Sequence, residues 1–266
     1  MGYLLRRQVA KTANMRYSLN VGINKYDRHF YGGNIDLNMC VFDAQRMVDY
    51  ANEREFLPAM MTDTLATVDN FKRHMKELSG TMVRGDILLL TISSHGTYDD
   101  YEVQSMKRKS PKRMTAHCFH DGMLWDFEMR EILRKFKAGT KVVKISDCCY
   151  AESNWRLVDK PGESRKARYT AKPKAAATPE PTQGDKRNIR CNYFDYAACN
   201  IYQEAYEDRR GGAFTTAIIE ALTAEPELSY YQLWRRTSSI LAGYYPQSPI
   251  FENVRSEKLT VTQFLT

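Results

Sequence analysis

The stretch that decides the fold is residues 141–150, which read KVVKISDCCY. A short β-branched run stops there at an aspartate and two adjacent cysteines. A second stretch of the same design, residues 86–96, reads DILLLTISSHG and stops at a histidine. Each is expected to be a buried strand with a reactive side chain at its carboxyl end. Such ends gather at one edge of an open parallel sheet, so His95 and Cys149 are predicted to be neighbours.

Hydrophobic periodicity on both sides of these stretches predicts strands that alternate with helices. The expected segments, in chain order, are strand 16–23, helix 36–53, strand 56–61, a helix from 68 that ends at Gly80, strand 86–94, a polar loop at 97–113, an extended segment at 114–119, a helix at 127–136, strand 141–145, strand 191–198, helices at 211–222 and 228–241, and a short strand from 248. This alternation indicates repeated βαβ units and a mainly parallel sheet.

Length and composition are typical of a soluble globular protein. With 266 residues, of which 43% are hydrophobic and 27% charged, the chain can bury one substantial core without cross-links. Apolar runs are too short for a signal segment or a membrane span, which predicts a cytoplasmic protein with no membrane partner. The six cysteines include the adjacent pair Cys148 and Cys149, so reduced thiols are expected rather than disulfides.

The net charge of +7 comes from two segments of the chain. Residues 155–190 contain ten Lys/Arg and four Asp/Glu, and residues 101–114 contain five Lys/Arg and one Glu. Both segments look like loops, and neither interleaves its basic residues with aromatic ones. A nucleic-acid partner is therefore disfavoured.

Residues 154–190 differ in composition from the rest of the chain. They are rich in Pro, Lys and Arg and contain few large apolar side chains, so they cannot bury a core. We expect a flexible basic linker between two folded parts, residues 1–153 and 191–266.

His95 and Cys149 together have the chemistry for acyl transfer. The imidazole of His95 would take the thiol proton, and the Cys149 thiolate would attack a carbonyl carbon. The backbone N–H groups of Gly96 and Cys149 are candidates for the oxyanion hole. The alternative for each residue taken alone is a packed histidine and a small buried cysteine.

A zinc site is the competing use of the same residue types. Residues 117–120, which read HCFH, could supply ligands together with the cysteine pair. The chain lacks a C-x-x-C pair, and adjacent cysteines chelate one ion poorly, so no metal site is predicted.

The order of the motifs resembles that of the caspase-like cysteine proteases, especially bacterial caspase homologues, metacaspases and paracaspases. The matching stretches are VGINKY at 21–26, LNMCVFDA at 37–44, SHG at 94–96, DGML at 121–124, DCC at 147–149, YAAC at 196–199, EAY at 204–206 and GGAFT at 211–215. The resemblance covers about residues 16 to 225.

The resemblance implies a caspase-like three-layer α/β/α sandwich with a six-stranded, mostly parallel sheet. It implies that residues 1–153 form the large, p20-like part of one domain and residues 191–266 its small, p10-like part. His95 matches the family's catalytic base, and Cys149 matches its nucleophile. Cys148 takes the place of the small residue before the nucleophile.

Three carboxylates match acidic residues that line the pocket for the substrate side chain before the cut. They are Asp43, Asp147 and, with a spacing that differs by about one residue, Glu204. Such a pocket selects Arg or Lys by charge pairing and fork-shaped hydrogen bonds. Without the family, a solvated carboxylate on a helix is the alternative interpretation of Asp43.

The chain also departs from the metacaspase pattern. Tyr150, Ala151 and Glu152 follow the nucleophile where metacaspases have His-Ser-Gly. The aspartate cluster that binds calcium in many metacaspases is not recognisable, so calcium dependence is unsupported and no cofactor is expected.

The sequence thus predicts a cysteine endopeptidase that cuts protein or peptide substrates after Arg or Lys. The basic linker predicts a zymogen that is cut by itself or by an upstream activating protease; the alternative is a solvated linker with no switching role. The rival functions are a catalytically silent caspase-fold protein that binds or regulates a partner and, less favoured, a nucleic-acid-binding protein.

Overall fold

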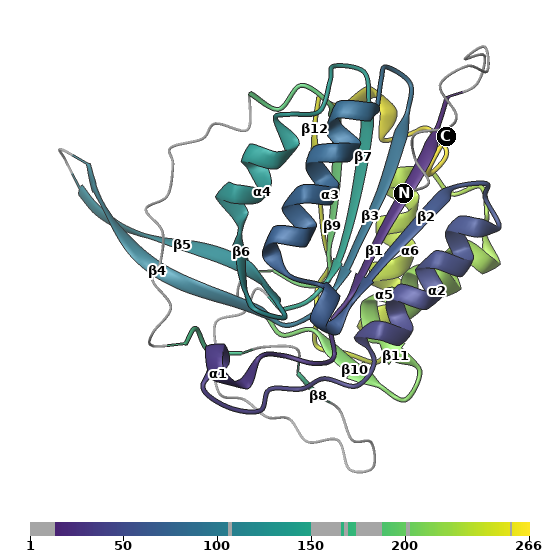
Figure 1. Cartoon of the computed structure of the whole chain (residues 1–266). Helices are drawn as coiled ribbons and strands as arrows, with labels where there is room; N and C mark the ends of the chain where they lie inside the picture. The colour runs from purple at the N-terminus through teal and green to yellow at the C-terminus, as the bar shows by residue number, and fades with distance from the viewer. Residues whose placement is uncertain are drawn as a thin grey trace.

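The computed structural model describes residues 14–105, 108–149, 166–167, 170–173, 188–200, 203–255 and 257–266. Its centre is a six-stranded sheet in the order β12-β9-β7-β3-β1-β2 (Figure 1). The strands are β1 (Arg16–Gly22), β2 (Leu57–Thr62), β3 (Ile87–Ser93), β7 (Lys141–Asp147), β9 (Asn192–Ala197) and β12 (Ile250–Val254). All neighbours pair in parallel except β12, which is antiparallel to β9.

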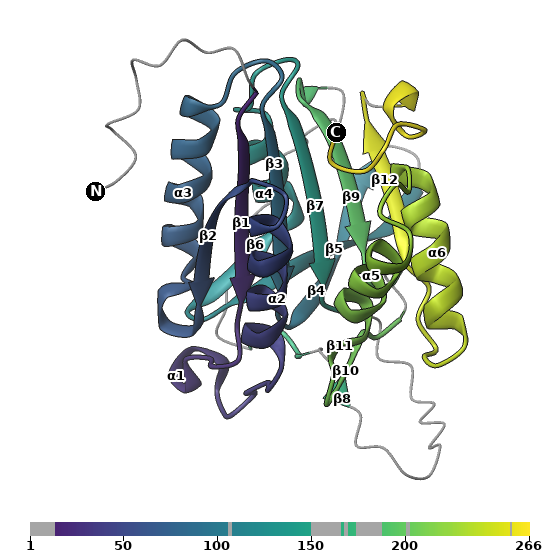
Figure 2. The ribbon, with the colours of Figure 1, turned by 90° about the vertical axis from the view of Figure 1, so that its right-hand side faces the viewer.

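Helices cover both faces of the sheet (Figures 1 and 2). One face packs against α3 (Val68–Thr81) and α4 (Asp126–Leu133), and the other against α2 (Cys40–Asn52), α5 (Ala213–Ala224) and α6 (Tyr230–Ala242). The short helices are α1 (Arg28–Tyr31), η1 (Asp63–Leu65) and η3 (Glu257–Leu259). The predicted three-layer α/β/α sandwich with a mostly parallel six-stranded sheet is confirmed.

The two layers of helices explain why the central strands are mostly apolar and buried. Every residue of β3 is buried, because both of its faces meet a helix layer. In β7 the side chains alternate: Val142 joins the core under α3 and α4, while Val143 and Ile145 join the core under α2, α5 and α6. Lys144, which faces the first core, forms an ion pair of 3.1 Å with Asp195 on β9.

The register of the sheet aligns three strand ends in one row. Gly22 of β1 pairs with Ser93 of β3, which in turn pairs with Asp147 of β7. A Cβ at Gly22 would overlap the carbonyl oxygen of Cys40, so the glycine lets the start of α2 pack directly on this end of the sheet. The loops that follow β1, β3 and β7 therefore meet at one edge.

The prediction of a polar loop at residues 97–113 is wrong. A long hairpin of β4 (Gly96–Ser105) and β5 (Arg108–Phe119) occupies this region and continues into β6 (Gly122–Trp125). The hairpin projects sideways from the body of the protein (Figure 1). Its outer part has no core to face, so it lacks the alternation of apolar and polar residues by which strands are recognised.

Other boundaries differ from the predicted ones by a few residues. The predicted helix 36–53 begins only at Cys40, and the helix expected to stop at Gly80 continues to Thr81. Its first turn is capped by the Thr67 side chain, which accepts a hydrogen bond of 3.1 Å from the Asn70 N–H.

A second, small sheet lies at the carboxyl edge of the large one (Figure 2). Its order is β11-β10-β8, formed by β11 (Gly211–Gly212), β10 (Tyr206–Asp208) and β8 (Lys166–Ala167). Most of the predicted linker, 154–190, and the residues that follow Cys149 lie outside the described residues. The three-part division of the domain therefore stays a prediction.

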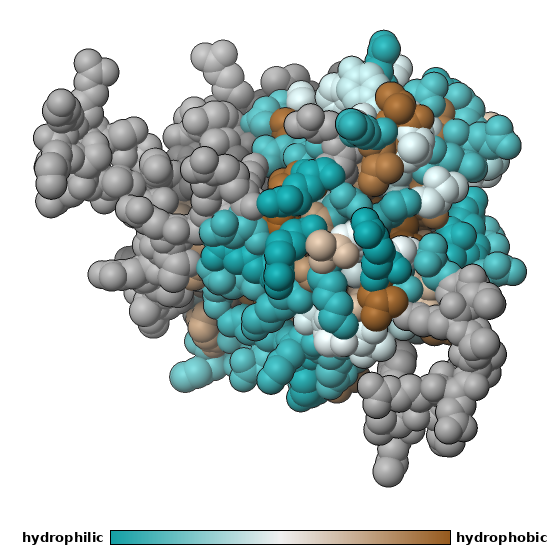
Figure 3. Space-filling model, turned by 90° about the horizontal axis from the view of Figure 1, so that it is seen from above, coloured by the Kyte–Doolittle hydropathy of each residue, from teal (hydrophilic) through white to brown (hydrophobic). Residues whose placement is uncertain are grey.

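The surface seen from above is largely hydrophilic, with scattered apolar side chains (Figure 3). This view looks at the amino ends of the parallel strands, the end opposite to the small sheet. Among the described residues, no helix is both long enough and apolar enough to cross a membrane.

We predict that Phe194→Ala lowers the free energy of unfolding by about 3–5 kcal/mol, because it empties a fully packed site in the core. Phe194 is completely buried, and its ring stacks on Tyr230 with centroids 3.9 Å apart. The matched control is Phe42→Ala on α2, where 47% of the residue is exposed and about 1 kcal/mol or less is expected. Urea denaturation of both variants measures the difference, and equal losses would contradict the assignment of the core.

Candidate active site

His95 and Cys149 follow neighbouring strands at equivalent positions. Ser93 pairs with Asp147 at the last position of β3 and β7, and each candidate residue comes two positions later. The N–H of Ser94 still donates to the carbonyl of Asp147 at 3.4 Å, so the two chains stay together beyond the strands. The expected meeting of the two strand ends is thus present in the backbone.

The His95 imidazole is held in a defined orientation. Its Nε2 lies 2.7 Å from the carbonyl oxygen of Ile35, and a carbonyl can only accept a hydrogen bond. Nε2 therefore carries the proton of the neutral ring, which leaves Nδ1 as the basic nitrogen. The backbone N–H of His95 donates to the Tyr26 hydroxyl at 2.8 Å, and the two rings pack with centroids 5.2 Å apart.

The peptide bond between His95 and Gly96 has a fixed direction. The carbonyl of His95 accepts a hydrogen bond of 2.9 Å from the Cys118 N–H. In a trans peptide the N–H points opposite to the carbonyl, so the Gly96 N–H is directed away from Cys118.

Gly96 lies directly against the backbone of Cys149. A Cβ added at Gly96 would overlap the Cys149 carbonyl oxygen and would lie 3.2 Å from the Cys149 nitrogen. Only glycine leaves room for this approach of the two chains. It brings together the two residues whose N–H groups are the predicted oxyanion donors.

The Cys149 thiol is buried and hydrogen-bonded to the polypeptide backbone. Its Sγ accepts a hydrogen bond of 3.0 Å from the Ala205 N–H and lies 3.5 Å from the Ala205 carbonyl oxygen. Burial is the main cause that raises the pKa of Cys149, and the neighbouring Cys199 raises it further. In this arrangement the sulfur is a thiol at neutral pH and is held by the segment that precedes β10.

Cys148 faces the opposite side of the sheet from Cys149. Its Sγ lies 3.2 Å from Nδ1 of His117 on β5, and both residues are buried. Burial, with a smaller effect of Lys144, lowers the pKa of His117, so this imidazole is neutral. This contact between Cys148 and His117 was not predicted, because it depends on where the hairpin folds back.

The two predicted pocket aspartates meet at the start of α5. Both Oδ atoms of Asp43 accept the Gly212 N–H at 3.0 Å, and Oδ2 of Asp43 also accepts the Ser93 hydroxyl at 2.9 Å. Oδ2 of Asp147 accepts the N–H and the hydroxyl of Thr215, at 2.9 and 2.8 Å. A helix N-terminus favours negative charge, which stabilises both buried carboxylates there. Asp43 is 1% exposed, so it is not a solvated helix carboxylate.

Glu204 and Glu207 have different positions around this cluster. Glu204 is half-buried, and its Oε2 lies 3.3 Å from the Tyr206 hydroxyl. Glu207, which sequence reasoning missed, pairs in register with Gly212, the residue that donates to Asp43. Its carboxylate accepts the N–H groups of Asn38 and Met39, at 3.1 and 3.3 Å, ahead of α2. Its burial on the short β10–β11 hairpin, which only the fold reveals, is the signal that singles it out.

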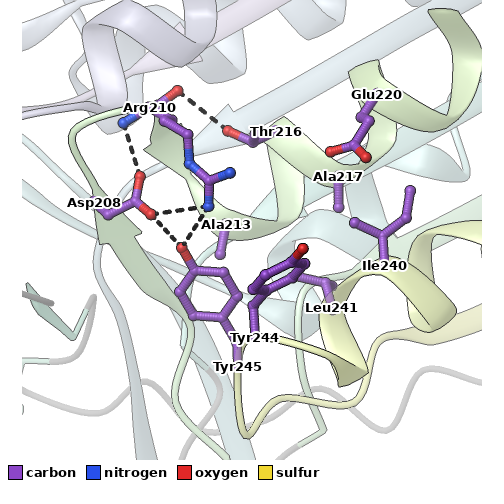
Figure 4. A pocket seen from close by; sticks show the side chains of 10 residues that line it. All are labelled: Asp208, Arg210, Ala213, Thr216, Ala217, Glu220, Ile240, Leu241, Tyr244 and Tyr245. Atoms are coloured by element: carbon purple, nitrogen blue, oxygen red, sulfur yellow. Dashed lines mark hydrogen bonds and ion pairs between the residues drawn. The ribbon is translucent and has the colours of Figure 1, made fainter. Parts of the chain in front are cut away.

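Hydrogen bonds and an ion pair hold the turn between β10 and β11. The residues that form them line a pocket beside α5 and α6 (Figure 4). Arg210 Nη2 lies 3.2 Å from Asp208 Oδ2, and the Tyr245 hydroxyl also donates to Asp208. The Thr216 hydroxyl donates to the Arg210 carbonyl at 3.2 Å. These contacts fix the turn that presents Gly212 to Asp43.

The residues of the zinc alternative do not converge on one point. His117 contacts Cys148, whereas Nδ1 of His120 lies 2.8 Å from the carbonyl of Lys25. Within the described part of the chain, no three His, Cys, Asp or Glu side chains lie close enough together to hold a metal ion.

The fold and these contacts define an α/β protein with a cysteine and a histidine at the carboxyl edge of a parallel sheet. A family model described as the caspase domain matches residues 15–260. The chain therefore belongs to the caspase-domain family, which at family level is a family of cysteine peptidases.

Two known proteins illustrate the relationship. The chain is 24% identical over 255 residues to Metacaspase-5 of Trypanosoma cruzi (strain CL Brener); the match covers 84% of this chain and 54% of that protein. The chain thus spans about half the length of this curated relative. The crystal structure of protein GSU0716 from Geobacter sulfurreducens superimposes with a TM-score of 0.75 and 21% identity, covering 95% of this chain and 98% of that one.

We predict that Gly96→Ala destabilises the protein by about 1–3 kcal/mol, because the new methyl group meets a backbone carbonyl that cannot move aside. The matched control is Gly80→Ala in α3, where no atom lies within 4 Å of the added Cβ. There, alanine should stabilise the helix by about 1 kcal/mol. Thermal unfolding compares the two; an unchanged Tm for Gly96→Ala would contradict the backbone contact with Cys149.

A second prediction concerns the reactivity of Cys149 with iodoacetamide. Thiols react as thiolates, and the raised pKa leaves little thiolate at pH 7. We expect alkylation slower than that of glutathione at pH 7, with a rate that rises with pH to above about pH 9. Mass spectrometry of the peptide that contains Cys149, with Cys149→Ala as control, measures the rate. A rate that is already maximal below pH 7 would contradict the protonated thiol.

Proposed function

We propose that the protein is a cysteine endopeptidase that cuts after Arg or Lys, with His95 as base and Cys149 as nucleophile. The observation that carries the proposal is the backbone contact of Gly96 with Cys149, which joins the two candidate residues and both candidate oxyanion donors. The hydrogen bond from Nε2 to the Ile35 carbonyl supports the role of His95 as base, because it leaves Nδ1 unprotonated.

The proposed reaction follows from these atoms. Nδ1 of His95 takes the thiol proton, and the Cys149 sulfur attacks the carbonyl carbon of the scissile bond. The N–H groups of Gly96 and Cys149 receive the oxyanion. The C–N bond then breaks, and His95 returns the proton to the leaving amine. Water, deprotonated by His95, hydrolyses the thioester and releases the second product.

Specificity for Arg or Lys is proposed to come from the carboxylates beside the start of α5. Asp43 and Asp147 are the sequence-derived candidates, together with Glu204. The register of Glu207 with Gly212 makes Glu207 a stronger candidate than Glu204. Three buried carboxylates in one place favour a cationic side chain, and a guanidinium can bond two of them at once.

The arrangement of Cys149 supports a zymogen. Its sulfur accepts a hydrogen bond from the Ala205 N–H, and this hydrogen bond must break before the sulfur can attack a substrate. A cut in the basic segment 154–190, by the protein itself or by an upstream protease, is the proposed activating event. It would release the segment that precedes β10 from its covalent tether.

We predict that a panel of fluorogenic peptides with Arg, Lys or Asp before the cut separates these proposals. Wild-type protein should cleave the Arg and Lys peptides, and Cys149→Ala should cleave none. A preference for Asp would contradict the acidic pocket, and equal rates in the two proteins would rule out the nucleophile.

A comparison of two variants identifies the third carboxylate of the proposed pocket, after Asp43 and Asp147. Glu207→Gln keeps the size of the side chain but removes its charge, so kcat/KM for the Arg peptide should fall about tenfold or more, the effect of one charge-assisted hydrogen bond. Glu204→Gln is the matched control, and its effect should be smaller. A larger loss for Glu204→Gln would restore the sequence-based assignment.

A further inference from the structure

The side chain of His117 on β5 lies on the same face of the β4–β5 hairpin as the position where Gly96 lacks a side chain. The two residues are directly opposite each other in the register of the hairpin. Opposite residues of an antiparallel pair place their side chains on one face. A Cβ at Gly96 would point into the backbone of Cys149, so the His117 ring lies on the face of the hairpin that meets this backbone.

The His117 ring holds the residue before the proposed nucleophile. Its Nδ1 lies 3.2 Å from the sulfur of Cys148, and both residues are buried. The Ala205 N–H holds the sulfur of Cys149, on the other side of the sheet. The peptide bond between the two cysteines is therefore fixed at both ends, and its N–H is that of Cys149, one of the two proposed oxyanion donors.

The next residue of β5 fixes the peptide that carries the other proposed donor. The Cys118 N–H donates to the His95 carbonyl at 2.9 Å, which sets the direction of the Gly96 N–H. In an antiparallel ladder, this bond makes Gly96 and His117 a non-hydrogen-bonded pair, the type whose side chains are closest and whose N–H groups point away from the partner strand. Two consecutive residues of β5 thus orient both peptides.

The end of β5 is itself well supported from outside the hairpin. The Tyr31 hydroxyl donates to the Phe119 carbonyl at 2.7 Å, and the His120 N–H donates to the Ala66 carbonyl at 3.0 Å. This base of the hairpin lies beside the carboxyl ends of the large sheet's strands (Figure 1). A residue that positions a site needs such a rigid support.

We propose that His117 is a positioning residue for the oxyanion hole: its contact with Cys148 fixes the Cys149 N–H relative to the Gly96 N–H. The proposal rests on the proposed function and adds to it a residue that touches neither the substrate nor the reacting atoms. Two donors stabilise an oxyanion fully only when both point at the same place. A tilted peptide between the cysteines would therefore weaken the transition state more than the bound substrate.

The first experiment compares His117→Leu with His117→Asn. Both side chains branch at Cγ, as histidine does, so each can place an atom where Nδ1 lies, but only Asn can form a hydrogen bond there. With a fluorogenic Arg peptide, His117→Leu should lower kcat about tenfold and leave KM unchanged. This is less than the roughly 100-fold to 1000-fold loss that follows removal of a whole donor. His117→Asn should recover most of the lost kcat.

The same contact is tested from its other end, which also covers the case that His117→Leu does not fold. Cys148→Ala should lower kcat as His117→Leu does, and Cys148→Ser, whose hydroxyl can bond to the ring, should recover most of the loss. In the double variant, His117→Leu with Cys148→Ala, the two losses should not add, because both substitutions remove one contact. Thermal unfolding shows which variants are folded.

A second experiment needs no catalysis. The full-length protein is labelled with ¹⁵N-glycine and ¹⁵N-cysteine, which marks 14 glycines and six cysteines for NMR. His117→Leu should shift the amide resonances of Gly96 and Cys149, and His117→Asn should return them toward their wild-type positions. Because both variants lack the imidazole ring, its loss alone affects them equally. Gly80 on α3 is the control, and its resonance should stay in place.

The outcomes separate this inference from the proposed function. Equal kcat in His117→Leu and His117→Asn, or a raised KM with unchanged kcat, overturns the positioning role even if the enzyme cuts peptides. Absence of turnover in wild-type protein overturns the proposed function, and the NMR spectra then decide the positioning role. Shifts of Gly96 and Cys149 that appear with Leu and reverse with Asn support it, and unmoved resonances overturn it.

Discussion

The backbone contact between Gly96 and Cys149 is the constraint on which the rest of the site depends. It forms because β3 and β7 are parallel neighbours whose last residues, Ser93 and Asp147, are in register. Parallel strands that end together release their loops on the same side of the sheet. A side chain at position 96 would push the two loops apart, so the glycine is needed for the close approach of the loop after β3 to Cys149, the proposed nucleophile.

A set of buried carboxylates links the early and late parts of the chain at the same edge. Asp43 from α2 and Asp147 from β7 accept hydrogen bonds from the start of α5, and Glu207 from β10 accepts them from the residues before α2. Each carboxylate compensates its burial with backbone or hydroxyl donors from another segment. In the proposed function, the same carboxylates would bind a cationic substrate side chain. One cluster would then stabilise the fold and select the substrate.

Sequence reasoning worked best where a residue's environment depends on local periodicity. The apolar runs of β3 and β7 predicted buried parallel strands, and the ends of those strands predicted the places of His95 and Cys149. It failed for the β4–β5 hairpin, whose outer residues are paired through the backbone and carry no hydrophobic pattern. It also missed Glu207, because a pairing with Gly212 across a turn has no counterpart in the spacing of the chain.

The sequence by itself determined the class of fold, the family and the order of the candidate catalytic residues, because hydrophobic periodicity and motif order are properties of the linear sequence. Only the tertiary structure decided which atoms meet. In the folded chain Nε2 of His95 contacts Ile35, the Cys149 thiol contacts Ala205 and Cys148 contacts His117. The short strand β8 pairs with β10. These contacts join residues that are distant in sequence, and the packing of the helix layers and loops around the sheet sets them.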